Sequence, residues 1–254
     1  MVSTRCNMPP IEGNKLPVET LQGPLQLPLK PIYEGFDCCF QQGNDVRTNM
    51  GYMFSHVIDG LYLGNIRDSE NRESLSQNGI THILSVYNNA KPALEDMTYL
   101  CIHAADASNQ NLLQHFKECI RFIHECRLNG GACLVHCLAG VSRSTTMVVA
   151  YLMTVTTYGW EECLSAVKAV RSFVGPNCGF QQQLQQFQRT QVSEYRAWLR
   201  TSYRPSPFKD QEKVSALLVL YAEQQAQERR RRGDQDWMNQ ASGVYAVPYS
   251  RYNR

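Results

Sequence analysis

The 254-residue sequence predicts an α/β fold with a central, mostly parallel, twisted sheet flanked by helices. Two observations carry this prediction. Short apolar runs alternate with amphipathic stretches from residue 56 to residue 199, as expected when strands alternate with helices. Hydrophobic residues make up 43% of the chain and charged residues 19%, which is enough apolar side chain to build a core. The length favours one such domain with tails.

Strands are expected at five short apolar runs, which are 56–58, 61–64, 80–86, 99–102 and 132–136. The first two flank an Asp59-Gly60 turn, and this pair indicates a hairpin. Helices are expected at six stretches, which are 70–78, 111–127, 143–154, 160–170, 180–199 and 210–232. The second of these has Leu112, Phe116 and Cys119 at helical spacing, which predicts one apolar face.

The chain divides into three parts by composition. Residues 1–53 form a proline-rich extension that we expect to be disordered, because six of the eleven prolines fall in the first 49 residues. Residues 54–200 are the predicted folded domain. Residues 201–254 form a polar C-terminal tail, which starts with a linker at Arg204-Pro205-Ser206-Pro207 and ends in a tyrosine-containing stretch.

Composition also excludes several classes of protein. The formal net charge is +2, which gives no reason to expect a nucleic-acid partner. No run of 18 apolar residues exists, so no transmembrane segment is expected, and the N-terminus lacks the apolar core of a secretory signal. We therefore expect a cytoplasmic location, with the nucleus and the inner plasma membrane as alternatives. Ten cysteines without any C-x-x-C pair predict reduced thiols rather than a zinc site.

The most informative segment is His136-Cys137-Leu138-Ala139-Gly140-Val141-Ser142-Arg143-Ser144. It leaves an apolar strand, turns through a glycine and enters a helix, which directs successive backbone N–H groups into one concavity that suits a phosphate. The same field lowers the pKa of a thiol at its base, so Cys137 is a candidate nucleophile. Arg143 can hold two phosphate oxygens with its planar guanidinium, and the Ser144 hydroxyl can reach the sulfur.

A phosphate ester also needs a proton donor for its leaving oxygen. Asp106 lies 31 residues before Cys137, just after a predicted strand, so a parallel sheet would bring it to the same edge as the Cys137 loop. Asp96 is the competing carboxylic acid. It precedes the same strand, and we expect it at the opposite edge of the sheet.

The segment 54–200 resembles the catalytic domain of cysteine-based dual-specificity protein phosphatases, especially their small atypical members. The resemblance rests on the 136–144 motif, on the spacing of Asp106, and on Gly175-Pro176-Asn177-Cys178-Gly179-Phe180. It implies a protein tyrosine phosphatase-like fold. It also implies hydrolysis of phosphotyrosine and phosphoserine or phosphothreonine in proteins, through a phosphocysteine and without metal or cofactor.

The resemblance assigns roles to individual residues. Cys137 is the implied nucleophile, Arg143 binds the phosphate, Asp106 is the general acid, and Ser144 assists when the thiolate leaves. Supporting roles fall to His136, which would orient the loop and lower the thiol pKa, and to Asn177 in a neighbouring turn. The phosphate loop comprises Leu138, Ala139, Gly140, Val141, Ser142 and Arg143.

Expected partners are phosphoproteins, including kinases of signalling cascades. The loop positions 138, 139, 141 and 142 are neutral, whereas phosphoinositide phosphatases usually carry lysines there, so a protein substrate is favoured. A catalytically weak phosphopeptide-binding or scaffold protein is the alternative function. Met50-Gly51 fits an N-myristoylation pattern but lies internally, so a membrane tether forms only if Gly51 becomes N-terminal and is myristoylated.

A disulfide between Cys137 and a second cysteine is a further hypothesis, because a reactive thiolate oxidises readily. Cys101 is preferred as the partner, since its strand leads to Asp106. Cys178 in the flanking turn is the second candidate. The alternative is that both are inert packing thiols.

Overall fold

The computed structural model describes residues 54–243, and it describes side chains up to Arg232. The proline-rich extension with Gly51, and the C-terminal tyrosines at 245, 249 and 252, lie outside the described residues.

The centre of the domain is a five-stranded sheet with the order β1-β2-β5-β3-β4. Its strands are β1 (Ser55–Ile58), β2 (Leu61–Gly64), β3 (Ile80–Val86), β4 (Thr98–Ile102) and β5 (Ala132–His136). The first two strands are antiparallel and the other neighbours are parallel, which confirms the predicted mostly parallel sheet. Gly60 turns the hairpin with a φ of 72°, a conformation that glycine adopts without strain.

Strand register brings several chain segments to one edge of the sheet. Gly64 on β2 and Ser85 on β3 both lie opposite His136 on β5, and Val86 lies opposite Ile102 on β4. Because these strands run in parallel, the residues that follow them leave the sheet on the same side. This carboxyl edge is where ligands bind in open α/β sheets.

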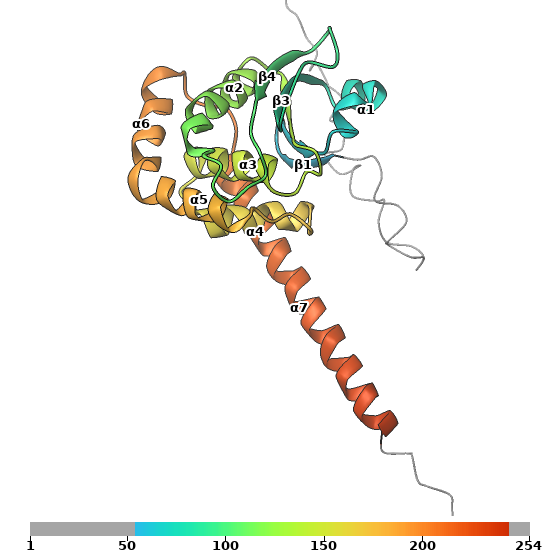
Figure 1. Cartoon of the computed structure of the whole chain (residues 1–254). Coiled ribbons are helices and arrows are strands. Elements are labelled where there is room, and N and C mark those ends of the chain that lie inside the picture. The colour runs from blue at the N-terminus through green and yellow to red at the C-terminus, as the bar shows by residue number, and fades with distance from the viewer. Residues whose placement is uncertain (1–53, 244–254) are drawn as a thin grey trace, which may run out of the picture. The chain divides into compact units, whose positions relative to one another are not determined.

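Helices cover both faces of the sheet, as Figure 1 shows. On one face, α1 (Arg72–Gln77) covers a small apolar cluster that includes Leu75, Ile83 and Leu134. The opposite face carries the larger core, which packs against α2 (Phe116–Leu128) and α3 (Arg143–Val155). Two 3₁₀ turns, Asp68–Glu70 and Leu113–His115, precede α1 and α2. Predicted strands and helices up to residue 170 therefore match the structure within a few residues.

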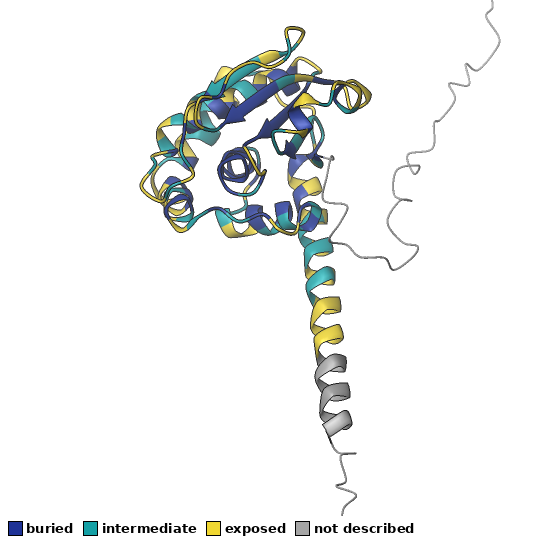
Figure 2. Ribbon diagram, turned by 45° about the vertical axis from the view of Figure 1, so that its right-hand side comes forward, coloured by how far each residue is buried: buried dark blue, intermediate teal, exposed yellow. Residues whose placement is uncertain are grey.

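The helix α3 runs through the middle of the domain. Residues from Arg143 to Thr154 are buried on all its sides (Figure 2). It contacts β5, α2 and α4 (Trp160–Val170), as well as the helices that follow. A helix that is apolar around most of its circumference must be surrounded by protein. Its N-terminus, which begins at the sequence motif, is therefore held firmly.

One predicted helix is two helices in the structure. The sequence predicts a single helix over 180–199, but α5 (Cys178–Thr190) and α6 (Val192–Ser202) are separated at Gln191, whose φ and ψ are −131° and −26°. The turn returns Val192 and Leu199 to the core, where both are buried. A straight helix would carry them roughly 20–30 Å beyond the start of α5, away from the core.

The last helix, α7 (Asp210–Gly243), begins against the domain rather than beyond it. Asp210 and Val214 are buried, and the Gln224 side-chain amide donates a hydrogen bond to the Ala169 carbonyl on α4 (3.1 Å). Residues 226–232 are exposed, including the four arginines at 229–232 (Figure 2). The predicted helix at 210–232 is present, but the boundary placed at residue 200 leaves out a segment that packs onto the domain.

A buried ion pair joins the start of α7 to α2. The Arg127 guanidinium on α2 donates to both carboxylate oxygens of Asp210, at 2.6 and 3.0 Å. It also donates to the Asp59 carbonyl and the Tyr151 hydroxyl, each at 2.7 Å, and lies 4.2 Å from the centre of the Phe208 ring. The side chains of Arg127 and Asp210 are only 1% and 5% exposed, so each charge depends on the other.

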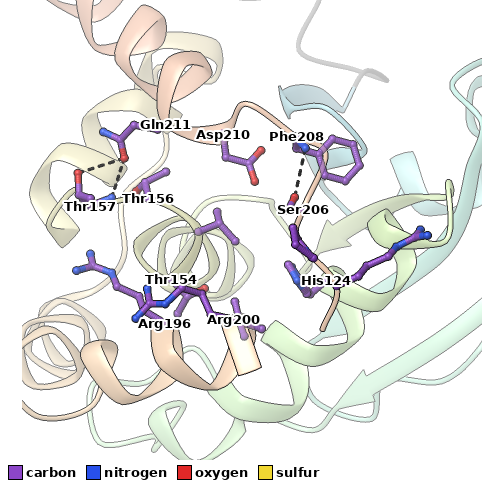
Figure 3. Close-up of a pocket in the computed structure, with 14 residues that line it drawn as sticks. His124, Thr154, Thr156, Thr157, Arg196, Arg200, Ser206, Phe208, Asp210 and Gln211 are labelled. Atoms are coloured by element: carbon purple, nitrogen blue, oxygen red, sulfur yellow. Dashed lines mark hydrogen bonds between the residues drawn. The ribbon is translucent and has the colours of Figure 1, made fainter. Parts of the chain in front are cut away.

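A cavity of about 510 Å³ lies beside this junction (Figure 3). Its walls include Val155 at the end of α3, Leu199 on α6 and Phe208 before α7. There the Gln211 side-chain oxygen accepts hydrogen bonds from the N–H and the hydroxyl of Thr157. The sequence motif begins the other end of α3, roughly 20 Å away along a 13-residue helix, so this cavity is separate from the predicted site.

Within the described residues, no helix combines the length and the apolar character needed to cross a bilayer.

Replacing Asp210 with alanine should lower the free energy of unfolding by about 3–5 kcal/mol, because the buried Arg127 charge loses its partner. Urea denaturation followed by circular dichroism measures this change. Lys213→Ala is the matched control, since its contact with Asp59 (3.6 Å) is about half exposed and should cost less than about 1 kcal/mol. Equal small losses in both variants would contradict the structural role of the buried pair.

Candidate active site

The turn from β5 into α3 has a backbone shape that requires glycine at its centre. Gly140 has a φ of 68°. A Cβ atom there would lie 2.5 Å from the Gly64 carbonyl oxygen and 2.8 Å from the Arg171 Nη2 atom. Any other residue would be strained here, because the conformation is left-handed and because a side chain has no space. This position fixes the course of the loop over residues 137–142.

Three carbonyl groups of the loop point outward to donors on surrounding segments. The Leu138 carbonyl accepts from the Ile66 N–H (3.3 Å), the Gly140 carbonyl from Arg171 Nε (3.1 Å), and the Val141 carbonyl from the Gly175 N–H (3.0 Å). Because these carbonyls are hydrogen-bonded on the outer side of the loop, the backbone N–H groups of the loop face inward. The loop therefore forms a concavity lined by N–H groups, and the binding of an anion there stays a prediction.

The Cys137 sulfur lies at the base of this concavity. Its residue is 1% exposed, and the sulfur accepts hydrogen bonds from the Gly140 N–H and the Ser144 hydroxyl, both at 3.2 Å. Burial raises the pKa of the Cys137 thiol, but the Ser144 hydroxyl and the backbone N–H groups of Ser144, Val141 and Gly140 lower it. The net effect is a lowered pKa, so the thiolate is favoured.

His136 supports the loop as a neutral side chain. Its Nδ1 atom lies 3.2 Å from the Cys137 carbonyl oxygen, which can only accept, so Nδ1 carries the proton. Nε2 then accepts from the Ser85 hydroxyl at 2.7 Å. Burial lowers the pKa of His136 to about 4, which outweighs the opposite effect of the Cys137 carbonyl. A neutral imidazole adds no positive charge beside the thiolate, and the role of His136 in orienting the loop and lowering the pKa of the thiol stays a prediction.

Asp106 reaches the loop from the carboxyl end of β4, as its spacing predicts. Its Oδ1 atom accepts hydrogen bonds from the Ser142 hydroxyl (2.8 Å) and from the Asn177 side-chain amide (2.9 Å). The Asn177 N–H also donates to the Ser142 hydroxyl oxygen (3.2 Å). Asp96 instead lies before β4 in an exposed pair with Arg72 (2.9 Å), so it stands apart from the motif.

Arg143 is buried beside Asp106. Its Nη1 atom donates to the Ala104 carbonyl (3.1 Å), and its Nε atom lies 3.5 Å from Asp106 Oδ2. Nε has no hydrogen-bond partner within the described part of the chain, although the residue is only 5% exposed. A buried donor without a partner is costly, and here it is available to an anion bound in the loop.

Two buried charged residues near the loop, Arg171 and Asp68, are absent from the sequence prediction. Arg171, at the end of α4, holds the Gly140 carbonyl and is 6% exposed. Asp68 is 1% exposed and accepts a hydrogen bond from the Asn65 N–H (2.8 Å). Burial raises the pKa of Asp68, with opposing effects of that bond and of the nearby Arg171 charge. The sequence could have indicated Arg171, because it is a charged residue directly after the apolar run Ala169-Val170.

The preferred disulfide partner of Cys137 is wrong for this structure. Cys101 lies opposite Ser85, and Ser85 lies opposite His136, so two strand spacings of about 4.8 Å separate Cys101 from His136. Cys137 directly follows His136, so the Cα atoms of Cys101 and Cys137 are also about 10 Å apart. This exceeds the reach of a disulfide, whose Cα atoms are usually less than about 7 Å apart. Cys178 is an exposed thiol at the start of α5, and its pairing with Cys137 stays a prediction.

The arrangement combines a favoured thiolate, inward amide groups, a buried guanidinium and a carboxylic acid within one small region. A thiolate can attack an electrophile, the amides and guanidinium can hold tetrahedral oxygens, and the acid can move a proton. Together these groups suit the hydrolysis of a phosphate monoester.

Comparison with known proteins gives the same result. Residues 61–190 match the family model "Dual specificity phosphatase, catalytic domain". The chain is 77% identical over 204 residues to dual specificity protein phosphatase 22-A of Danio rerio, covering 80% of this chain and 97% of that protein. It is 55% identical over 170 residues to human dual specificity protein phosphatase 22, covering 67% of this chain and 92% of that protein.

A solved structure is also similar. The crystal structure of DUSP15 aligns with a TM-score of 0.59 and 49% sequence identity, covering 60% of this chain and 98% of that one. Fold, sequence and local motif thus agree with the resemblance found in the sequence. The chain belongs to the dual specificity phosphatase family and is a cysteine-dependent protein phosphatase.

Proposed function

We propose that this phosphatase hydrolyses phosphotyrosine, phosphoserine and phosphothreonine in proteins through a phosphocysteine formed on Cys137. The observation that carries the proposal is the lowered pKa of the Cys137 thiol at the base of inward-facing amides, with Asp106 and Arg143 beside it. The neutral side chains at loop positions 138, 139, 141 and 142 support a protein substrate over a polyanionic lipid or RNA.

In the first step, the Cys137 thiolate attacks phosphorus in line, so an S–P bond forms as the ester P–O bond breaks. Asp106, in its protonated form, gives its proton to the leaving oxygen. Arg143 and the loop amides hold the three other oxygens and stabilise their charge in the transition state.

In the second step, water attacks phosphorus and the S–P bond breaks, which releases inorganic phosphate and restores the thiolate. The Asp106 carboxylate takes the proton from water, and the Ser144 hydroxyl stabilises the departing sulfur through its 3.2 Å hydrogen bond. Asn177 and Ser142 hold Asp106 where both proton transfers take place. His136 fixes the Cys137 carbonyl and thereby the start of the loop.

Phosphorylated kinases of signalling cascades are the proposed physiological substrates, at the cytoplasmic, nuclear or inner-membrane sites where such kinases act. Membrane attachment requires an N-terminal glycine, so it is proposed only for a product that begins at Gly51. A phosphopeptide-binding scaffold without turnover is disfavoured, because the residues for both chemical steps are present around one loop.

Cys137→Ser should lower turnover of 4-nitrophenyl phosphate by more than about a thousandfold yet keep binding of a phosphotyrosine peptide, because the amides and Arg143 remain. Steady-state kinetics and calorimetric titration measure the two effects. Arg143→Lys should also lose turnover, since an ammonium group cannot offer two parallel N–H donors. Cys178→Ser, which changes an exposed thiol, is the control that keeps activity. Residual activity above about one per cent in Cys137→Ser would refute the assignment of the nucleophile.

Asp106→Ala should slow hydrolysis of an alkyl phosphate by roughly 10²–10⁴, because a poor leaving group needs the proton. The loss should be much smaller for 4-nitrophenyl phosphate, whose leaving oxygen needs little protonation. Comparing kcat for the two substrates isolates this effect. Asp96→Ala, at the opposite edge of the sheet, should change neither rate. An equal loss on both substrates would exclude Asp106 as the general acid.

Ser144→Ala should raise the pKa of the Cys137 thiol, because the lost hydrogen bond stabilises only the thiolate strongly. The midpoint should therefore move to higher pH, as expected when a hydrogen bond to a charged group is lost. The pH dependence of iodoacetamide alkylation, followed at Cys137 by mass spectrometry, reports the midpoint. Thr145→Val removes a neighbouring buried hydroxyl that has no partner among the described residues, and it should leave the midpoint in place. An unmoved midpoint in Ser144→Ala would show that Ser144 does not set the pKa.

A further inference from the structure

Large apolar side chains are rarely exposed in the described part of the chain, and two of those that are lie at the phosphate loop. Leu138 is 48% exposed, Phe173 is 44% exposed, and Val219 on α7 is 58% exposed. Leu138 directly follows the nucleophile. Phe173 lies two residues before Gly175, whose N–H holds the Val141 carbonyl. Two exposed apolar side chains, each on a segment of the proposed reaction site, suggest a contact surface.

One face of the Phe173 ring packs against the side chain of Arg171. The guanidinium carbon of Arg171 lies 4.6 Å from the ring centroid, within the range of a cation–π contact. Arg171 in turn donates to the Gly140 carbonyl at 3.1 Å and is itself buried. One face of the ring is therefore fixed against a group that is bonded to the phosphate loop, while nearly half of the residue faces solvent.

Leu138 has a comparable position on the loop. Its carbonyl accepts a hydrogen bond from the Ile66 N–H at 3.3 Å, so its backbone is anchored while its side chain stays exposed. Cys137, its neighbour, is almost completely buried. Leu138 is therefore an exposed apolar residue directly next to the buried Cys137 in the chain.

We propose that Leu138 and Phe173 form an apolar rim that contacts a large apolar side chain next to the phosphorylated residue of a protein substrate. The inference rests on the proposed function, which fixes the phosphate in the loop. An extended peptide advances about 3.3 Å per residue, so the residues adjacent to the phosphorylated one pass over the edge of the loop. The preferred substrates therefore carry leucine, isoleucine or phenylalanine at such a position.

The test uses the full 254-residue chain and pairs of phosphotyrosine peptides that differ only in leucine or glutamine beside the phosphotyrosine, on either side. For the wild type, kcat/KM should favour the leucine peptide of at least one pair by about fivefold, as expected if roughly 40 Å² of apolar surface leaves water. Phe173→Gln and Leu138→Gln should each bring this ratio close to one. Phe173→Leu, which keeps an apolar side chain, should retain most of the preference.

Val219→Gln is the matched control, because it changes another exposed apolar residue, on α7, and should keep the wild-type ratio. A wild-type ratio near one would overturn the proposal. An equal loss of kcat/KM on both peptides and on 4-nitrophenyl phosphate in Phe173→Gln, with the ratio kept, would show that Phe173 only supports Arg171. A concentration-dependent dimer that Phe173→Gln abolishes, with the ratio kept, would assign the rim to a second copy of the chain. A wild type that fails on 4-nitrophenyl phosphate would instead refute the proposed function, and this inference with it.

Discussion

The chemistry of the site depends on one constraint, which is that the carbonyl groups of the loop after Cys137 point away from the sulfur. Each of these carbonyls would repel an anion, and each would be costly if it were buried without a donor. The donors come from three segments that are distant in sequence: the turn after β2, the end of α4 and the turn before α5. The two turns and the end of α4 therefore act together to keep the N–H groups of the loop available to phosphate.

Two arginines serve this loop in different ways. Arg171 is bonded to the protein through Gly140, so its charge is built into the wall of the site. Arg143 is also buried, but its Nε atom has no hydrogen-bond partner among the described residues. A guanidinium with a spare N–H group can donate to a phosphate oxygen without first breaking a hydrogen bond at that atom, which reduces the cost of reorganisation on binding.

The sequence predicts the parts of this structure that local patterns determine. Apolar runs of strand length and the glycine-containing turn follow from residues close to one another, and parallel pairing then places Asp106 at the same edge as Cys137. Arg171, the break at Gln191 and the docking of α7 depend instead on distant partners. Asp210, for example, is polar and stands after a proline-rich linker, and only Arg127, 83 residues away, explains its burial.

The proposed nucleophile and the proposed acid are held by separate hydrogen-bond networks that share one stretch of backbone. The Cys137 sulfur is bonded to Gly140 and Ser144, whereas Asp106 is bonded to Ser142 and Asn177. Asn177 uses both ends of its side chain, because its oxygen also caps α5 at the N–H of residue 180. The acid is thus tied to the first turn of α5 and the thiolate to the first turn of α3. Because Ser142 and Ser144 are only two residues apart, the geometry of attack and of proton transfer is set by a single short turn.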